Sequence, residues 1–379
     1  MEKVGKRKIF VKTKTIRQLY TKLLKPILFL CNPEPVHNTF TKIGAFFGQF
    51  NWVRQLTHYL FYYENSALEQ TVCGIHFKNP VGLSAGFDKD AELVNILPHV
   101  GFGFMSIGSV TAKPYAGNAR PWLYRLPKSK SILVNFGLKN IGVTKIIAKL
   151  KQSQKTFPWL ISIAKTNCKE NADIHAGIND YAESLKALEK NGVGDIYELN
   201  ISCPNAYGGE PFTTPERLEM LLSKITTLGL TKPIMLKMPI NLPWNEFKKL
   251  LDVSISFNIA GVIIGNLNKD RASAEIKDEI PAGLKGNLSG KPTWDLSNTL
   301  ISETYKYCGR KLVIVGVGGI FSPKDTYEKI KRGATLVQLI TGMIFEGPAL
   351  IGDINCGLVE LLERDGFKSI SEAVGSFYN

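Results

Sequence analysis

The sequence predicts an α/β protein, a (β/α)8 TIM barrel with an N-terminal amphipathic helical extension. Three observations predict this fold. From about residue 77 onward, eight short apolar runs alternate with longer amphipathic stretches. Polar residues suited to chemistry follow several of these runs, at the strand ends where such barrels place their sites. Before the first run, apolar residues repeat at helical spacing. We therefore divide the chain into a basic helical segment, residues 1–63, and a barrel domain, residues 64–379.

The composition excludes several classes of protein. The 379 residues include 47 Lys and Arg against 33 Asp and Glu, a net charge of +14, and 44% are hydrophobic, so the chain is neither disordered nor collagen-like. Six Cys occur without a Cys-x-x-Cys pair, which argues against zinc ribbons, iron–sulfur clips and a dense disulfide framework. We expect no metal site and a reducing compartment. Because no run of 18 apolar residues exists, no segment is expected to span a membrane.

The excess positive charge is concentrated at the start of the chain. Residues 1–63 contain eleven Lys and Arg against two Glu. Apolar residues form three successive stripes at helical spacing, within 16–28, 36–50 and 52–63. Basic amphipathic helices of this kind are suited to lying on an anionic bilayer, with lysines at the head groups and Phe, Leu and Trp in the acyl boundary. The alternative is that the stripes pack on the barrel and the lysines are solvated.

The first stripe predicts a helix with one polar face. Arg17 and Lys22 lie on the face opposite the apolar residues. Pro26 is expected to kink or end this helix, because proline lacks an N–H and its ring clashes with the preceding turn. The Pro-containing break at 32–35 then separates the first stripe from the second.

Eight apolar runs are the expected barrel strands. They are Val81–Gly86, Phe104–Ser109, Leu160–Lys165, Ile196–Ser202, Ile234–Met238, Gly261–Asn266, Leu312–Val317 and Leu336–Thr341. An open doubly wound sheet is the competing architecture, but it would gather the polar residues at one switch point rather than at many strand ends. A ninth run, Ser131–Gly137, is placed in a connection after the second strand. The stretch Ala282–Gly290 is expected to be a mobile loop.

Two strand ends indicate a site for a flat ligand and a proton-transfer group. The first run leads through Ala85 and Gly86 to Lys89, so small residues allow close approach and Lys89 supplies positive charge. The fourth run leads to Cys203, which lies between Asn200 and Asn205. A nearby cation would lower the pKa of this thiol from about 8.5 into the physiological range and make it a base or acid. The alternative is a small buried apolar side chain.

Other strand ends indicate a phosphate. Lys237 ends the fifth run among apolar neighbours and needs an anionic or acceptor partner. Asn266 ends the sixth. Gly318 and Gly319 follow the seventh run and Thr341 ends the eighth, the usual place for a barrel to bind phosphate through backbone N–H groups. Together these features favour a phosphorylated flavin with a small anionic substrate stacked on it. A Rossmann site is not indicated, because no Gly-x-Gly-x-x-Gly follows the first run.

Six longer segments carry a family resemblance. They are NPVGLSAGFDKD (79–90), GFGFMSIGSVTAKPYAGNARPWLYRL (101–126), NISCPN (200–205), LSGKP (288–292), IVGVGGI (314–320) and LVQLITGMIFEGP (336–348). With them, residues from about 30 to 355 resemble the dihydroorotate dehydrogenases, in particular the membrane-associated, quinone-linked class 2 enzymes. The segment PEPVHNTF (33–40) looks like the class 2 extension, which forms the quinone entry tunnel in that family.

The resemblance implies oxidation of dihydroorotate to orotate in de novo pyrimidine biosynthesis. A base at the position of Cys203 would take the C5 proton while hydride leaves C6 for flavin N5, and FMN would pass electrons to ubiquinone or menaquinone. The implied substrate residues are Lys89, Asn135, Asn200, Asn205 and Asn266. The implied FMN positions are Ala85, Gly86, Lys89, Ser109, Ser162, Asn200, Lys237, Gly265, Gly318, Gly319, Ile340 and Thr341.

The resemblance also implies an acceptor site and a location. Arg125 matches the arginine at the quinone site. Residues 1–63 would provide peripheral association with the cytoplasmic face of a bacterial inner membrane, or with the mitochondrial inner membrane in a eukaryote. No nucleic-acid partner is expected.

Several positions depart from the class 2 pattern. Cys203 replaces the usual Ser and matches the soluble class 1 enzymes instead. Val134 stands where an Asn binds the substrate carboxylate, so that this Asn is missing or shifted by one to Asn135, and Leu267 replaces a substrate-binding hydroxyl residue. The remaining departures are Ser162 and Gly265, which replace an Asn and a Thr at FMN, and Ile340, which replaces a quinone-side Tyr.

Two other functions are open at this point. A tRNA dihydrouridine synthase also has Cys-Pro after the corresponding strand, and the charge of +14 would suit RNA. Against it, the charge lies in an amphipathic segment at the wrong end of the chain, and Asn205 with LSGKP favours a free pyrimidine. The other possibility is a diverged flavoprotein that has lost enzymatic turnover. It is suggested by Val134 and Leu267, which replace substrate-binding residues of the family.

Overall fold

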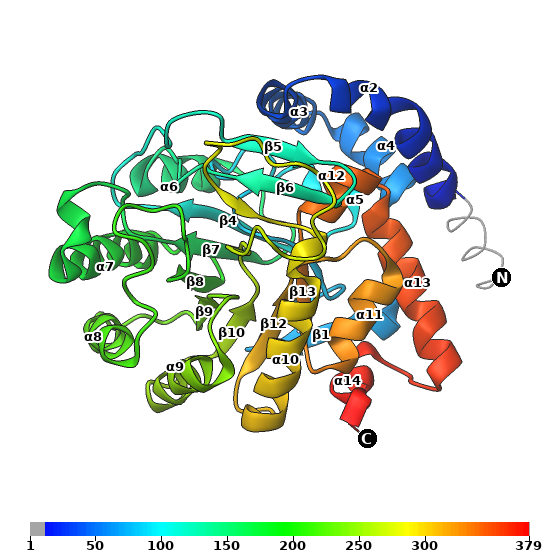
Figure 1. The fold of residues 1–379 in the computed structure, drawn as a ribbon. Coiled ribbons are helices and arrows are strands. Elements are labelled where there is room, and N and C mark those ends of the chain that lie inside the picture. Colours follow the sequence, from blue (N-terminus) through cyan, green and yellow to red (C-terminus); the bar gives the residue numbers. More distant parts are fainter. Residues whose placement is uncertain (1–11, 379) are drawn as a thin grey trace.

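The computed structural model describes residues 12–378 and contains a closed barrel of eight parallel strands (Figure 1). In chain order the strands are β3 (Val81–Leu83), β4 (Phe104–Val110), β7 (Trp159–Ile163), β8 (Ile196–Asn200), β9 (Ile234–Met238), β10 (Gly261–Ile264), β12 (Val313–Val317) and β13 (Leu336–Leu339). Each strand pairs in parallel with the next, and β13 pairs with β3 to close the barrel. The predicted fold class and all eight predicted strands are confirmed.

The strands end earlier than their apolar runs predicted. In five of the eight, regular pairing stops two or three residues before the predicted end, as at Leu83 instead of Gly86. The residues beyond these ends leave the hydrogen-bonded ladder. Several of them, Gly86 and Asn266 among them, line the cavities described below.

The amino end of the barrel is filled by apolar side chains. A hairpin of β1 (Gln70–Val72) and β2 (Ile75–Phe77) lies there, and the Phe77 ring packs edge-on against Phe104 at a centroid distance of 5.3 Å. Both rings belong to one buried cluster with inward side chains from the other strands. The predicted site residues lie at the opposite, carboxyl end of the barrel, where the two cavities described below open.

Helices surround the barrel (Figure 1). They are α5 (Leu97–Val100), α6 (Val143–Gln152), α7 (Ile174–Lys190), α8 (Pro215–Thr226), α9 (Trp244–Ser256), α10 (Trp294–Cys308), α11 (Pro323–Lys331), α12 (Thr341–Glu346), α13 (Leu350–Asp365) and α14 (Ile370–Ala373). Short 3-10 turns are η2 (Ser66–Leu68), η3 (Glu170–Ala172), η4 (Lys291–Thr293) and η5 (Ser376–Tyr378). Side-chain caps fix several starts: Asp173 accepts from the Ala176 N–H, and Ser322 from the Asp325 N–H.

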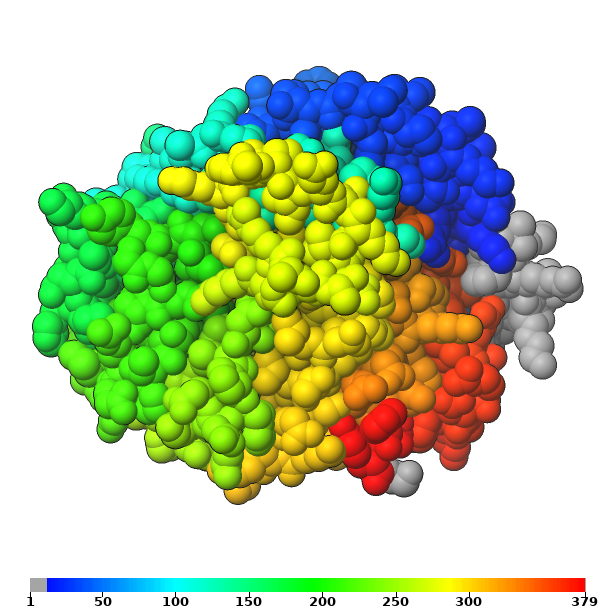
Figure 2. Space-filling view, viewed as in Figure 1, coloured from blue at the N-terminus to red at the C-terminus, as the bar shows by residue number. Residues whose placement is uncertain are grey.

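A second sheet lies over the carboxyl end of the barrel. Its antiparallel strands are β5 (Leu123–Leu126), β6 (Ser131–Val134) and β11 (Asn287–Leu288), in the order β11-β6-β5. Strand β6 confirms the ninth run as part of a connection after the second barrel strand. The expected loop over 282–290 is wrong at β11, because Leu288 pairs with Leu133 and buries its side chain. Figure 2 shows this segment, in yellow, over the front of the barrel.

The N-terminal extension is helical, as predicted. Residues 12–19 are helical and continue through a π-helical turn, η1 (Tyr20–Leu24), into α2 (Lys25–Leu30). Helices α3 (Pro33–Phe47) and α4 (Asn51–Phe61) follow. The expected kink or end at Pro26 is replaced by this widened turn directly before it, which accommodates a residue that has no N–H to donate.

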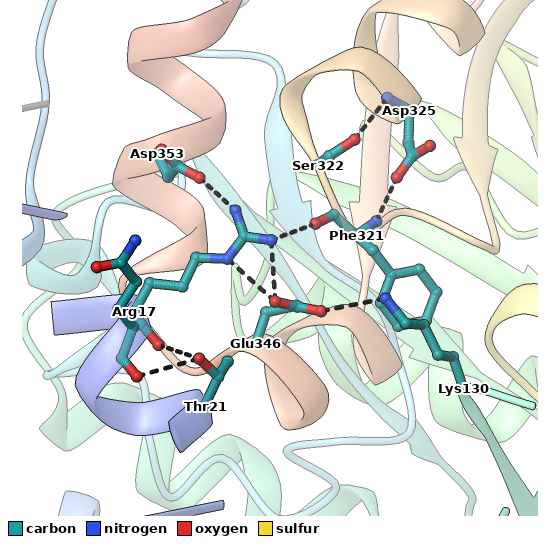
Figure 3. Close-up of polar contacts among 9 residues, drawn as sticks. Arg17, Thr21, Lys130, Phe321, Ser322, Asp325, Glu346 and Asp353 are labelled. Carbon is teal, nitrogen blue, oxygen red and sulfur yellow. Dashed lines mark hydrogen bonds and ion pairs between the residues drawn. The ribbon is translucent and has the colours of Figure 1, made fainter. Parts of the chain in front are cut away.

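The first helix is docked on the barrel through its polar face (Figure 3). The Arg17 guanidinium donates to the Glu346 carboxylate at 2.9 and 3.1 Å, to the Asp353 carboxylate, and to the Phe321 carbonyl at 3.1 Å. Lys130 is a second cation 3.6 Å from Glu346. Arg17 is therefore not one of the solvated or head-group cations that the helical pattern suggested.

The apolar face of the extension points outward. Thirteen of the nineteen exposed large apolar side chains among the described residues lie between positions 19 and 59. Leu23 and Ile27 are each 62% exposed and Leu30 is 89% exposed. Tyr20 and Phe29 of the same helix contact the barrel instead, Tyr20 through the Ile344 carbonyl and Phe29 edge-on against Phe345. The first helix therefore shows both behaviours, and the two alternatives for the stripes stay open. Across residues 12–378, no helix combines the length and apolar character that crossing a bilayer requires.

Candidate functional site

Two adjoining cavities open at the carboxyl end of the barrel. The first, here the glycine cavity, has a volume of about 520 Å³, and its lining includes Gly265, Thr293, Gly318, Gly319 and Gly342. The second, here the lid cavity, has a volume of about 910 Å³ and lies under the second sheet, with a lining that includes Lys89, Val134, Phe136, Asn200, Cys203 and Asn205. Both cavities are bounded by Ala85, Lys237, Asn266, Leu267, Ser289, Ile340 and Thr341.

The glycine cavity has a wall of exposed backbone. Gly318 and Gly319 both have positive φ, 106° and 71°. A Cβ on Gly318 would lie 2.4 Å from the Thr293 hydroxyl oxygen, and one on Gly319 would lie 2.7 Å from the Trp294 Cβ. Only glycine therefore fits these two positions, and the loop presents main chain rather than side chains to the cavity. Backbone surfaces of this kind, after the seventh and eighth strands, suit a phosphate group.

A buried polar network lies beneath both cavities. The Lys237 ammonium donates to Ser84 Oγ at 3.1 Å and lies 3.7 Å from Glu198 Oε1. Ser106 Oγ donates to Glu198 Oε2 at 2.7 Å and accepts from the Gln338 amide at 2.8 Å. Glu198 is the anionic partner that a buried Lys237 requires, and it fixes the ammonium at the floor of the site. The sequence pattern did not single out Glu198, because it lies within an apolar strand.

Strand β8 places a buried amide at the cavity wall. The Asn200 amide donates to Ser109 Oγ at 2.8 Å, and that hydroxyl lies 2.9 Å from Ser162 Oγ. The Asn200 Oδ1 atom is buried and accepts no hydrogen bond within the described residues. An acceptor left in this state is costly, so Asn200 is suited to receiving an N–H from a bound ring. Ser162 lines neither cavity and contacts Ser109 through the hydrogen bond between their hydroxyl groups.

Cys203 lines the lid cavity, but its thiol is not activated as expected. Burial raises the pKa of Cys203 to about 11, and the nearby Lys237 and Lys165 ammonium groups lower it by less. The expectation that a neighbouring cation brings this pKa into the physiological range is therefore wrong. The loop itself is held in place, because Asn266 donates to Ser202 O at 2.9 Å and to Ser202 Oγ at 2.7 Å.

Asn205 joins the cysteine loop to the second sheet. Its amide donates to the Val134 carbonyl at 2.9 Å and its Oδ1 accepts from the Asn287 amide at 2.8 Å. Asn205 thus connects the thiol-bearing loop with β6 and β11.

Lys89 is one of three lysines that line the lid cavity, with Lys139 and Lys237. It is buried, and its ammonium lies 3.6 Å from the centroid of the Phe136 ring. Burial lowers the pKa of Lys89 to about 7, with the Lys139 charge acting in the same direction and Asp90 and Asp88 opposing it. A bound carboxylate would favour the charged form, so this position is suited to an anionic ligand.

Asn135 does not line either cavity. Its Oδ1 accepts from the Asn118 amide at 3.2 Å and its own amide donates to the Ala119 carbonyl at 3.3 Å. Ile132 and Val134 are the β6 residues that line the lid cavity. The Asn expected at this point of the family pattern is therefore replaced by an apolar wall.

The lid cavity reaches toward the N-terminal helices. His37 of α3 lines it, together with Leu123 and Ile344. Burial, with Lys89 and Lys139 nearby, lowers the pKa of His37 to about 3, so this imidazole is neutral. His37 lies in the PEPVHNTF segment but was not assigned a role there.

Arg125 lies on β5, where its side chain contacts the extension, and it lines neither cavity. Its guanidinium is 4.6 Å from the Phe29 ring centroid and donates to the Cys31 carbonyl at 2.6 Å. The predicted quinone-side arginine is thus in contact with the first helix.

The structure brings most of the predicted site residues together. Those lining one or both cavities are Ala85, Gly86, Lys89, Ser109, Asn200, Cys203, Asn205, Lys237, Gly265, Asn266, Gly318, Gly319, Ile340 and Thr341. Those that line neither are Arg125, Asn135 and Ser162. Within residues 12–378, no group of three or more His, Cys, Asp or Glu side chains is placed to hold a metal ion.

A family model described as dihydroorotate dehydrogenase matches residues 67–362. The chain belongs to the dihydroorotate dehydrogenase family. A curated relative from Crocosphaera subtropica, named dihydroorotate dehydrogenase (quinone), is 36% identical over 335 residues, which cover 86% of this chain and 88% of the relative. A relative of the same name from Trichodesmium erythraeum is 33% identical over 379 residues, which cover 94% of this chain and 98% of the relative.

Solved structures share the fold. A crystal structure described as DHODH from Eimeria tenella in complex with ferulenol has a TM-score of 0.82 and 24% identity, covering 92% of this chain and 96% of that one. The ligand-free form from the same organism has a TM-score of 0.81. The resemblance inferred from the motifs is confirmed, and the chain is a member of an oxidoreductase family that acts on CH–CH donors.

Proposed function

We propose that this protein oxidises dihydroorotate to orotate in de novo pyrimidine biosynthesis, with FMN as cofactor and a quinone as electron acceptor. The observation that carries the proposal is the buried Asn200 Oδ1 without a partner, in the same cavity as the Cys203 thiol and the Lys89 ammonium. An acceptor, a proton-transfer group and a cation around one small space are what an anionic pyrimidine requires. The names of the relatives, dihydroorotate dehydrogenase (quinone), support the same assignment.

The residues fit FMN. Gly318 and Gly319 present backbone to the glycine cavity, because a Cβ at either position would collide with Thr293 or Trp294, and a backbone wall suits the phosphate. Lys237 would supply a fixed positive charge for the N1–C2 carbonyl side of the ring. Ala85 and Gly86 allow a flat ring to approach the main chain. When bound, FMN would accept the hydride and pass two electrons on.

The substrate residues proposed from the lid cavity are Lys89, Asn200, Asn205 and Asn266. Lys89 would bind the substrate carboxylate. The three asparagine amides would bind the polar edge of the pyrimidine ring. Asn135 can reach the substrate only by giving up its bonds to Asn118 and Ala119. The apolar Val134 leaves the carboxylate with one donor fewer than the family pattern provides.

Cys203 is the proposed base. Its thiolate would remove the C5 proton while the C6 hydride leaves on the other side of the ring. Because the pKa of Cys203 is raised to about 11, the thiol is protonated at neutral pH, and only a small thiolate fraction is competent to take the proton.

Residues 1–63 are the proposed quinone and membrane segment. Its described helices expose a continuous set of large apolar side chains, and the lid cavity reaches α3 at His37. A surface of this kind is stabilised by burial in the acyl boundary of a membrane, with peripheral rather than spanning attachment. Arg125, which contacts the first helix, is the proposed quinone-side cation.

Anaerobic mixing with dihydroorotate tests the reaction. Purified protein loaded with FMN should lose its flavin absorbance on mixing with dihydroorotate and regain it with a soluble quinone analogue, but not with fumarate or NAD. A colourless protein that cannot be reconstituted with FMN, or a flavin that dihydroorotate leaves oxidised, would refute the proposal. Steeply salt-dependent binding of tRNA would instead favour the dihydrouridine synthase reaction.

A further inference from the structure

Lys329 is a buried cation outside both cavities. It lies on α11, is completely buried, and donates to Ser297 Oγ and Asn298 Oδ1, each at 2.9 Å. Its ammonium also lies 4.9 Å from the centroid of the Trp294 ring. Among the ion pairs of residues 12–378, none includes Lys329. A buried ammonium with only neutral partners is costly, because no anion offsets its lost hydration.

No acidic side chain of residues 12–378 forms an ion pair with Lys329, although two aspartates lie near it. Asp325 lies one turn before Lys329 on α11, but its carboxylate accepts from the Phe321 N–H at 2.9 Å (Figure 3). Burial lowers the pKa of Lys329 to about 7, and the Asp325 and Asp295 charges do not restore it. Arg332 and Lys291 add further positive charge nearby. Asp325 and Asp295 therefore offset the buried charge of Lys329 only in part, and neither makes direct contact with its ammonium.

The glycine loop lies directly in front of this cation. Ser297, which accepts from Lys329, donates to the Val317 carbonyl at 2.5 Å, one residue before Gly318. Trp294, whose ring faces the ammonium, packs against Gly319 so closely that a Cβ there would lie 2.7 Å from the Trp294 Cβ. The side chains of Ser297 and Trp294 thus connect Lys329 to the Gly318–Gly319 backbone that forms one wall of the glycine cavity.

Other features at the same place favour an anion. Helix α10 begins at Trp294, so the positive end of its dipole lies behind the loop. The Lys291 ammonium lies 5.0 Å from the same Trp294 ring. The start of α10 and the two lysines, Lys291 and Lys329, therefore place positive charge on one side of the Gly318–Gly319 loop. The glycine cavity lies on the other side of this loop.

We propose that Lys329 is a positioning residue for the phosphate of FMN. From behind the Gly318–Gly319 loop it supplies positive charge that complements the phosphate dianion, and it acts through the loop and the Trp294 ring without touching the ligand. The phosphate in turn would add negative charge on the side of Lys329 that faces the glycine loop, where no acidic side chain pairs with it. This inference rests on the proposed function, because it requires that the glycine cavity hold the FMN phosphate.

Comparison of FMN with riboflavin isolates the phosphate. Riboflavin has the same ring and ribityl chain but no phosphate, so a charge that serves the phosphate affects only FMN binding. The affinities of the apo-protein for both flavins are measured by equilibrium dialysis with flavin absorbance. The variants are Lys329→Met, which removes the charge, and Lys329→Gln, which removes the charge but keeps a donor for Ser297 and Asn298. Lys324→Met is the matched control, because Lys324 is an exposed lysine on the same helix.

The Lys329 variants should weaken FMN binding by about tenfold or more, equivalent to roughly 1.4 kcal/mol, and leave riboflavin binding unchanged. The Lys324→Met variant should bind both flavins as the unmodified protein does. Equal weakening of FMN and riboflavin in both Lys329 variants, or no weakening, would show that Lys329 only joins α11 to α10. Failure of the unmodified protein to bind FMN would overturn the cofactor assignment itself, which is a different result from a loss of selectivity in the variants.

Discussion

The rate of flavin reduction should depend steeply on pH through Cys203. Burial raises the pKa of this thiol to about 11, so at pH 8 about one molecule in a thousand carries the thiolate. That scarcity adds about 4 kcal/mol to the barrier, since each pKa unit corresponds to about 1.36 kcal/mol. Because the thiolate is the proposed base, the rate should rise nearly tenfold per pH unit from pH 7 and level off only as the pH approaches the pKa.

Anaerobic stopped-flow mixing with dihydroorotate measures this dependence without the quinone step. Cys203→Ser should lower the rate at pH 8 and move the rise to higher pH, because a hydroxyl is a weaker acid than a thiol by several units. Cys203→Ala should abolish the rise. A flat profile between pH 7 and pH 10 in the unmodified protein, or variants that reduce flavin at the original rate, would show that Cys203 is structural.

Three further predictions concern the extension and the lid cavity. Deletion of residues 1–63 should retain flavin reduction by dihydroorotate and lose both quinone reduction and liposome flotation; undiminished flotation would exclude these helices as the anchor. Arg17→Met leaves Glu346 and Asp353 without their main cation and should weaken docking of the first helix by about 1–3 kcal/mol. Faster tryptic cleavage after Lys22 measures the weakened docking, and an unchanged cleavage rate would contradict the prediction. Val134→Asn returns a donor to the cavity wall and should tighten orotate binding about tenfold. A titration of the flavin spectrum with orotate measures it, and equal or weaker affinity would show that position 134 does not face the carboxylate.

The barrel was predictable because its strands are buried on both faces. Each one is then a continuous apolar run, which stands out against the helical periodicity between the runs. The ends of the strands were less predictable. Gly86 and Asn266 continue their runs in the sequence, but in the structure they turn away from the ladder to line the cavities. A pattern of residue types does not record where hydrogen bonding between strands stops.

The partners of the site residues were not predictable from local sequence. Lys237 was expected to need an anion, but the identity of that anion, Glu198, depends on the pairing of β8 with β9. The pKa of Cys203 depends on how much protein surrounds the thiol, which no spacing indicates. In the sequence, Arg17 lies on the lysine-rich polar face of the first helix and looked solvent-exposed. In the structure it binds Glu346, 329 positions away.

Helix α12 connects three parts of the molecule that the sequence treats separately. Its first residues, Thr341 and Gly342, line the glycine cavity, and Ile344 lines the lid cavity. The Tyr20 hydroxyl donates to the Ile344 carbonyl at 2.7 Å, and Glu346 at the end of α12 binds Arg17. A helix of only six residues has little stability of its own, so its position depends on these tertiary contacts. Docking of the N-terminal helix through Arg17 and Tyr20 therefore holds the carboxyl-terminal half of α12, while the Thr341–Gly342 end of that helix is held by the barrel strand before it.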